Sequence, residues 1–145
     1  MSRKIERRLR KCIDTFLESD RELLDKDVNE RSITHKLAEH IQREFKGWHV
    51  DCEYNRKWQR PKTLEGKCFA EVCPDDIHAR TVYPDIIIHH RGIPDNLLAI
   101  EVKKRTNPDG LDIDRAKLAG FKEELGYKYI ALVVLDGAHY ELELN

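Results

Sequence analysis

The sequence has no excess of charge of either sign and no long apolar run. Its 145 residues include 26 basic and 27 acidic side chains, which gives a formal net charge of -1. This balance excludes a uniformly basic nucleic-acid coat and an acidic disordered tail. No apolar run approaches the roughly 18 residues that a membrane span needs. The charged residues 1–12 lack a following apolar stretch, so we expect no secretory signal, no membrane contact and a cytoplasmic protein.

Two common functional motifs are also absent. There is no G-x-x-x-x-G-K-[ST] loop to cradle phosphates, so we expect no nucleotide cofactor and no ATPase activity. No serine lies in a recognisable motif with histidine and aspartate partners, so serine hydrolysis has no support.

Cysteine is scarce, and its spacing does not define a metal site. None of the four cysteines forms a C-x-x-C pair. Cys52, Cys68, Cys73 and His78 leave a structural metal site open, although their spacing falls outside the usual zinc-ligand ranges. The alternative is reduced cysteines that are partly buried as small hydrophobic side chains.

The remaining pattern is that of one charge-rich α/β domain, residues 1–145. Charged residues make up 37% of the chain, against about 25% in an average soluble domain. Apolar periodicity and turn residues predict a helix at 3–18 with a short second turn at 23–24, a helix at 28–45, a strand at 48–55, an irregular stretch at 56–81, strands at 82–90 and 97–103, a helix at 112–125, and strands at 127–135 and 139–144. The short connection between the second and third strands predicts an antiparallel hairpin. We therefore expect a mixed sheet with helices on its faces.

Three polar residues stand out at the ends of this hairpin. Pro-Asp occurs four times and Glu-x-Lys three times, but only Asp85 opens an apolar strand, and only Glu101 and Lys103 end one. Glu101 and Lys103 are two positions apart, so they project from the same face of their strand, and Val102 projects from the other. A hairpin places the start of 82–90 across from the end of 97–103. Asp85 and Glu101 should therefore meet.

This arrangement is suited to a hard divalent cation. Two carboxylates, the backbone carbonyl of Val102 and waters are ligands for Mg²⁺ or Mn²⁺. Lys103 is placed to orient a water, and a bound cation lowers the pKa of water and stabilises charge on a phosphate. Glu30, in the first turn of the helix at 28–45, is a third acid that can face the same place. The alternative is a turn acid with a surface salt bridge, and an acid at a helix N-terminus favoured by the macrodipole.

Pro84-Asp85, fifteen intervening residues and then Glu101-Val102-Lys103 resemble the PD-(D/E)xK nuclease superfamily, which has the restriction endonuclease-like fold. The predicted element order is similar to the αβββαβ core of that superfamily. The resemblance implies a core at 28–136, an N-terminal helical addition at 1–27 and a final edge strand at 137–145. It also implies that Asp85 and Glu101 bind the metal, that Lys103 activates water, and that Glu30 completes the site. Lys117 matches a polar position of some members more loosely.

The function implied by the resemblance is metal-dependent hydrolysis of nucleic acid, with DNA expected in preference to RNA. Basic side chains expected to contact the nucleic acid are Arg56, Lys57, Arg60, Lys104, Arg105 and Lys117. A homodimer is expected by analogy, because two strands need two sites. The alternatives are a catalytically inactive nucleic-acid-binding or assembly module of the same fold, and an α/β interaction domain without nucleic acid. His89 and Glu53 are reserve candidates, His89 because it shares strand parity with Asp85.

Overall fold

The computed structural model describes residues 2–26, 28–54, 56–57, 60–61, 63–64, 80–81, 83–105 and 110–145, with side chains described outside 55–82. The helices are α1 (Ser2–Asp20), α2 (Glu22–Asp25), α3 (Glu30–Glu44) and α4 (Leu111–Leu125). The strands are β1 (His49–Cys52), β2 (Arg56–Lys57), β3 (Arg60–Pro61), β4 (Thr63–Leu64), β5 (Arg80–Thr81), β6 (Ile86–His90), β7 (Asp95–Lys104), β8 (Tyr129–Asp136) and β9 (His139–Leu144). In the described ranges, no helix is long and apolar enough to cross a bilayer.

The main sheet has five strands in the order β1-β6-β7-β8-β9, and two further pairs, β2-β3 and β4-β5, lie apart from it. Strands β7 and β8 are parallel, and the other neighbours in the main sheet are antiparallel. The parallel pair is joined by α4, because two parallel neighbours need a crossover connection. The predicted mixed α/β fold, with a hairpin of β6 and β7, is therefore confirmed.

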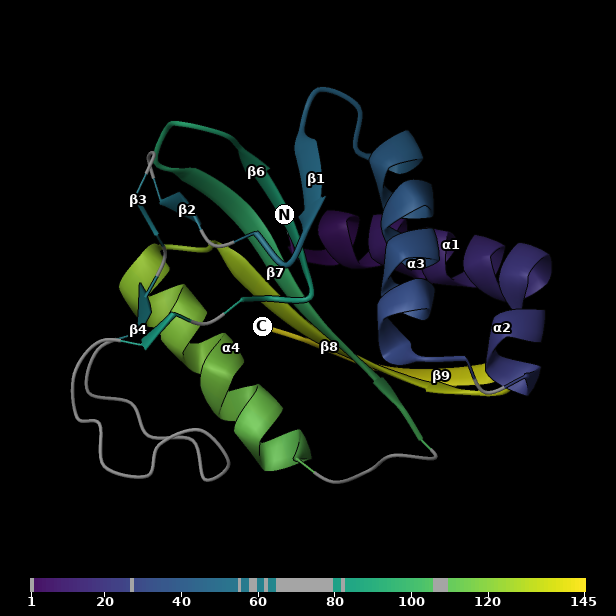
Figure 1. Ribbon diagram of the computed structural model, residues 1–145. Helices are drawn as coiled ribbons and strands as arrows, with labels where there is room; N and C mark the ends of the chain where they lie inside the picture. Colours follow the sequence, from purple (N-terminus) through teal and green to yellow (C-terminus); the bar gives the residue numbers. More distant parts are fainter. Residues whose placement is uncertain are drawn as a thin grey trace.

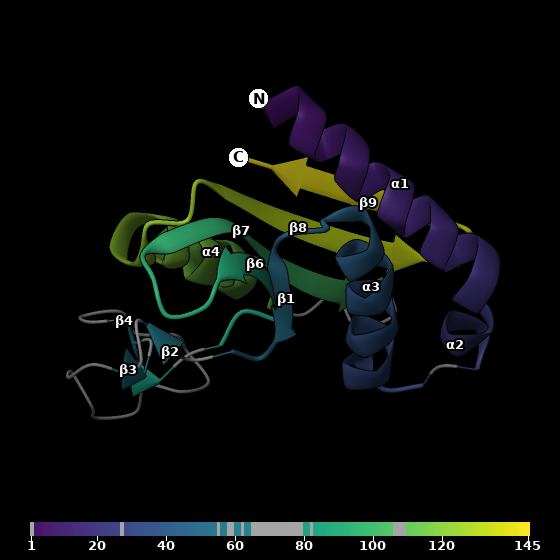
Figure 2. The ribbon, with the colours of Figure 1, turned by 90° about the horizontal axis from the view of Figure 1, so that it is seen from above.

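Helices cover both faces of this sheet (Figure 1). Helices α1 and α3 pack on one face, and α4 packs on the other. Seen from above, α1 lies beside β9 (Figure 2), where Arg10 contacts Tyr140. Strand alternation explains how one apolar run serves both layers: Ile86 and Ile88 face α1 and α3, whereas Ile87 faces α4.

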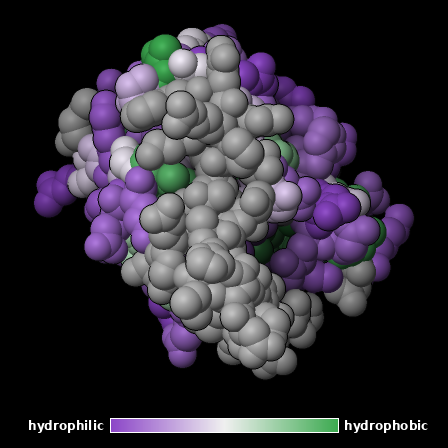
Figure 3. Space-filling model, turned by 60° about the vertical axis from the view of Figure 1, so that its left-hand side comes forward, coloured by the Kyte–Doolittle hydropathy of each residue, from purple (hydrophilic) through white to green (hydrophobic). Residues whose placement is uncertain are grey.

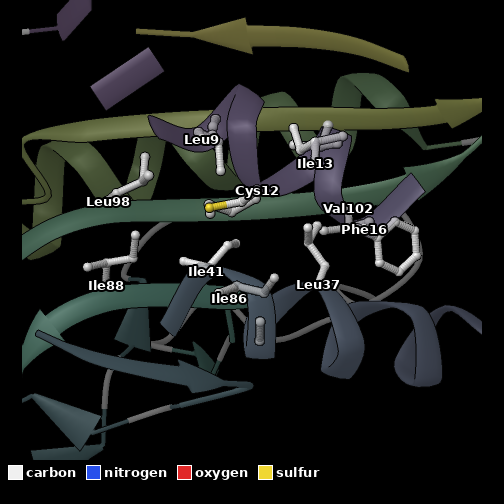
Figure 4. Packing of buried hydrophobic residues seen from close by; sticks show 14 of the residues in the cluster. Leu9, Cys12, Ile13, Phe16, Leu37, Ile41, Ile86, Ile88, Leu98 and Val102 are labelled. Atoms are coloured by element: carbon white, nitrogen blue, oxygen red, sulfur yellow. The ribbon is translucent and has the colours of Figure 1, made fainter. Parts of the chain in front are cut away.

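The larger core lies between α1, α3 and the sheet. Figure 4 shows Leu9, Ile13 and Phe16 of α1 pointing toward the strands, and all three are fully buried. Helix α1 therefore belongs to the main hydrophobic core. The described outer surface seen in Figure 3 is mostly hydrophilic, as the high content of charged residues predicts.

The element boundaries depart from the predictions at a few residues. Helix α3 begins at Glu30, because Asn29 caps it by accepting a hydrogen bond from the Ser32 amide at 2.9 Å. Strand β1 ends at Cys52 and not at residue 55, because Glu53 adopts a left-handed backbone with a φ of 49°. Strand β8 begins at Tyr129 and not at residue 127, because Gly126 ends α4 with a φ of 73°.

Candidate active site

Asp85 lies directly before β6 and reaches across to β7. Its Oδ2 accepts a hydrogen bond from the Val102 amide at 2.8 Å, and its backbone carbonyl accepts one from the Glu53 amide at 3.1 Å. The start of β6 and the end of β7 are therefore side by side, as the hairpin predicts. The amide and carbonyl of one strand residue point to the same side, so the Val102 carbonyl is also directed toward the Asp85 side of β7.

Glu101 is the buried acid of the site. Its side chain faces α4, on the opposite side of β7 from Val102, and only 3% of the residue is exposed. Its Oε1 is the one buried side-chain nitrogen or oxygen in the described residues without a hydrogen bond, and the Lys117 Nζ lies 3.4 Å from it. Burial raises the pKa of Glu101 well above its usual value, and the neighbouring Asp85 raises it further.

The two carboxyl groups behave as a coupled pair. Burial is also the largest cause of the raised pKa of Asp85, although the Val102 amide, the hydrogen bond with Glu101 and the charge of Lys117 act in the opposite direction. Ionising both of these neighbouring carboxyl groups costs free energy, because their charges repel, unless a cation compensates them. The pair therefore has affinity either for a shared proton or for a positive ion.

Lys103 and Glu30 approach this pair from two elements. Lys103 shares the α4 face with Glu101, and its Nζ lies 3.1 Å from Asp114 Oδ2. Glu30, at the start of α3, is near enough to act on the pKa of both Asp85 and Lys103. Of the four predicted catalytic residues, Asp85 and Glu101 are paired, Lys103 shares the α4 face with Glu101, and Glu30 lines a groove with Asp85.

Sequence reasoning missed Asp114, which is 8% exposed in the first turn of α4. The helical spacing in the sequence could have revealed it. One face of the helix carries Asp114, Leu118, Phe121 and Leu125, and all four are buried. An acid that continues an apolar stripe faces inward. Lys117, three residues further along, is on the adjacent part of the same face and reaches Glu101.

A surface groove of about 750 Å³ leads to Asp85. It is lined on one side by the start of α3, including Glu30, and on the other by Cys52 and Glu53. Glu53 pairs there with Arg31 at 3.4 Å. The reserve candidate Glu53 therefore borders the site without joining the acid pair.

Several basic residues expected to contact nucleic acid either have partners of their own or lie outside the described residues. Lys104 Nζ donates a hydrogen bond to the Val28 carbonyl at 2.9 Å, and Arg105 pairs with Glu141 of β9 at 2.7 Å. Their expected contact with nucleic acid stays a prediction. The side chains of Arg56, Lys57 and Arg60 lie outside the described residues, as do Cys68, Cys73 and His78 of the open zinc alternative.

His89 does not approach the acid pair either. It is 2% exposed, and its Nε2 lies 2.7 Å from Asp51 Oδ2 on the neighbouring strand β1. Strand alternation places His89 on the same face as Ile87, whose partner on β1 is Asp51, so His89 reaches Asp51 on that strand. Arg91 also binds Asp51, and although burial opposes it, these two partners hold the pKa of Asp51 well below its usual value.

Within the residues whose positions are described, no group of three or more histidine, cysteine, aspartate or glutamate side chains is arranged to hold a metal ion. A metal site here would rest on the two carboxylates, a backbone carbonyl and water. That set is sufficient for Mg²⁺, which commonly uses one or two carboxylates and keeps several waters. The chain matches no family model, no curated protein and no solved structure.

Proposed function

We propose that this protein is a metal-dependent nuclease of restriction endonuclease-like fold that hydrolyses phosphodiester bonds, in DNA in preference to RNA. The observation that carries the proposal is the buried acid pair of Asp85 and Glu101, joined across β6 and β7, with Lys103 on the same face of β7 as Glu101. These are the residue types of the PD-(D/E)xK pattern, and they occupy the ends of two paired strands.

The order of elements supports the same proposal. Apart from the short strands β2 to β5, the order is helix α3, strands β1, β6 and β7, helix α4 and strand β8, or αβββαβ, which is the core order of that superfamily. Glu30 begins the first of these helices, and Lys117 lies on the second. Helices α1 and α2 precede the core, and β9 follows it.

The donor atoms fit a hard divalent cation. A buried carboxylate oxygen without a hydrogen bond, such as Glu101 Oε1, is unfavourable unless a positive charge compensates it. Asp85, Glu101 and the Val102 carbonyl would hold Mg²⁺ or Mn²⁺. A cation bound there would lower the pKa of a coordinated water and stabilise negative charge on the phosphate.

The lysines and Glu30 have distinct roles in this proposal. Lys103 would donate a hydrogen bond to the attacking water and so fix its direction toward the phosphorus. Lys117, beside Glu101, would offset charge on the phosphate once the nucleic acid is bound. Glu30, near Asp85 and Lys103, would hold a water at the mouth of the groove.

A second candidate is an inactive nucleic-acid-binding or assembly module of the same fold. The observation that favours it is the short distance from Lys117 to Glu101, because an internal ammonium group can compensate the carboxylate without a metal. The two candidates differ in one property: only the nuclease requires a divalent cation.

Cleavage of plasmid, linear and branched DNA, and of RNA, in Mg²⁺, Mn²⁺ or EDTA tests the proposal. We expect cleavage of at least one substrate with metal, none with EDTA, and a loss of at least about 100-fold in Asp85→Asn. Asp112→Asn is the matched control, because Asp112 is an exposed acid on α4. Binding of DNA without cleavage in any metal, or an Asp85→Asn variant as active as the wild type, would refute the nuclease.

A further inference from the structure

The acid on α4 that faces the site, Asp114, has no role in the proposed chemistry so far. Its side chain is 12% exposed and that of Lys103 is 13% exposed, so their ion pair is largely shielded from water. A shielded ion pair adds little stability over an apolar pair of similar volume. Helix α4 is already held to the sheet by Leu118, Phe121 and Leu125. The ion pair is therefore better explained by what it does to Lys103 than by stability alone.

Three acids compete for the Lys103 ammonium group. Asp114 forms the ion pair at 3.1 Å, while Asp85 and Glu30 attract the same charge from further away. Without Asp114, the flexible lysine would be drawn toward Glu30 and Asp85, which is the side of the proposed cation site. Asp114 thus decides which side of the site the ammonium group lies on.

The backbone before α4 lies close to the Lys103 ammonium group. Gly110 has a φ of 85°, and a Cβ added to it would lie 3.7 Å from the Lys103 Nζ. The Gly110 carbonyl accepts a hydrogen bond from the Asp114 amide at 2.8 Å, which fixes the first turn of α4. The end of β7 and the start of α4 therefore meet at the Lys103 ammonium group.

We propose that Asp114 is a positioning residue, which holds the Lys103 ammonium group beside the acid pair of Asp85 and Glu101 and keeps it from occupying the cation site. The role in catalysis rests on the proposed nuclease function, whereas the position of the ammonium group does not. The two parts can be tested separately.

Kinetics tests the catalytic part. We expect Asp114→Ala to lower kcat by roughly 10-fold to 100-fold with KM for DNA within about twofold, because small displacements of a positioned group cost rate more than binding. Asp114→Asn keeps an acceptor oxygen and the side-chain volume, so its loss should be smaller. In a Lys103→Ala background, adding Asp114→Ala should cost less than about twofold more, because the residue acts through the lysine. Asp112→Ala, in the same helical turn and with a fully exposed side chain, is the control.

Nuclear magnetic resonance tests the position without any activity. In ¹H–¹⁵N spectra of lysine ammonium groups, Lys103 should give a slowly exchanging signal in the wild type and in Asp112→Ala. In Asp114→Ala the signal should shift or disappear, because the ammonium group has lost its partner on α4. A signal absent from the wild type, or unchanged in Asp114→Ala, overturns the proposal. A kcat within twofold of the wild type, or an equal loss in the Lys103→Ala background, overturns the catalytic part. If the wild type cuts no nucleic acid, the proposed function fails, and the spectra still decide the position.

Discussion

The Lys117 ammonium group lies 3.4 Å from Glu101 Oε1, and that oxygen has no hydrogen bond within the described ranges. This relationship joins α4 to the end of β7 at the most deeply buried charge of the site. It means that the chain supplies a monovalent cation of its own to an acid pair that would otherwise favour a proton or a divalent ion.

Removing the internal cation should strengthen metal binding. We expect Lys117→Met to tighten Mn²⁺ binding by roughly threefold to tenfold, because an ammonium group near the site repels the incoming ion. Isothermal titration without nucleic acid measures this. Lys122→Met, an exposed lysine on the same helix, is the control. Unchanged or weaker Mn²⁺ binding in Lys117→Met would contradict the account.

Replacing the buried acid Glu101 should abolish metal binding and raise the stability of the metal-free protein. Burial disfavours the ionised form of Glu101, so we expect Glu101→Gln to stabilise the metal-free protein by about 1–2 kcal/mol. The increase in Tm that Mn²⁺ causes in the wild type should disappear in this variant. Scanning calorimetry with EDTA and with Mn²⁺ measures both, and Glu18→Gln on the exposed face of α1 serves as the comparison. A Glu101→Gln variant that is less stable than the wild type, and whose Tm still rises with Mn²⁺, would contradict this prediction.

Helix α1 should be required for the fold, although it precedes the αβββαβ elements. Leu9 is fully buried in the core shared by α1, α3 and the sheet. We expect Leu9→Ala to lower the free energy of unfolding by about 3 kcal/mol, within the range for buried leucines. Denaturant unfolding followed by circular dichroism measures the loss. Arg7→Ala, on the exposed face of α1, should change stability by less than about 0.5 kcal/mol.

His90 should make stability depend on pH above about 6.5. Its Nδ1 faces Asp95 Oδ2 at 2.6 Å and its Nε2 faces the Gly47 carbonyl at 2.8 Å, so both nitrogens must be donors. The hydrogen bond with Asp95, followed by that with Gly47, raises the pKa of His90 above 6.5. A raised histidine pKa contributes stability that is complete below pH 6.5 and is lost as pH rises through the folded-state value.

Thermal unfolding between pH 6 and pH 9 checks this dependence. The wild type should lose Tm over this interval, and His90→Gln should lose less, because it has no imidazolium to titrate. His139→Gln, which replaces an exposed histidine on β9, should behave as the wild type does. Equal losses of Tm in the wild type and His90→Gln would show that His90 is not the responsible group.

Strand alternation and turn residues were enough to predict the hairpin that joins Asp85 to the end of β7. The position of Lys103 on the Glu101 face followed from the same alternation. The contact between His89 and Asp51 could not be predicted, because it depends on how β1 pairs with β6. Periodicity does not fix the pairing register of two strands that are far apart in the sequence.

The role of Asp114 was hidden for a different reason. An acid in the first turn of a helix is favoured by the macrodipole alone, so its identity carries little information. Only its place on the stripe of Leu118, Phe121 and Leu125 distinguishes it from the exposed Asp112. The partner of Lys103 became apparent once α4 was packed against β7.

The most direct test of the central claim is the anomalous diffraction of crystals soaked in Mn²⁺. The account predicts one strong anomalous peak within coordination distance of the Asp85 and Glu101 carboxylates, with the Lys117 ammonium group displaced from Glu101. A structure at saturating Mn²⁺ with no peak there, and with Lys117 still beside Glu101, would contradict it.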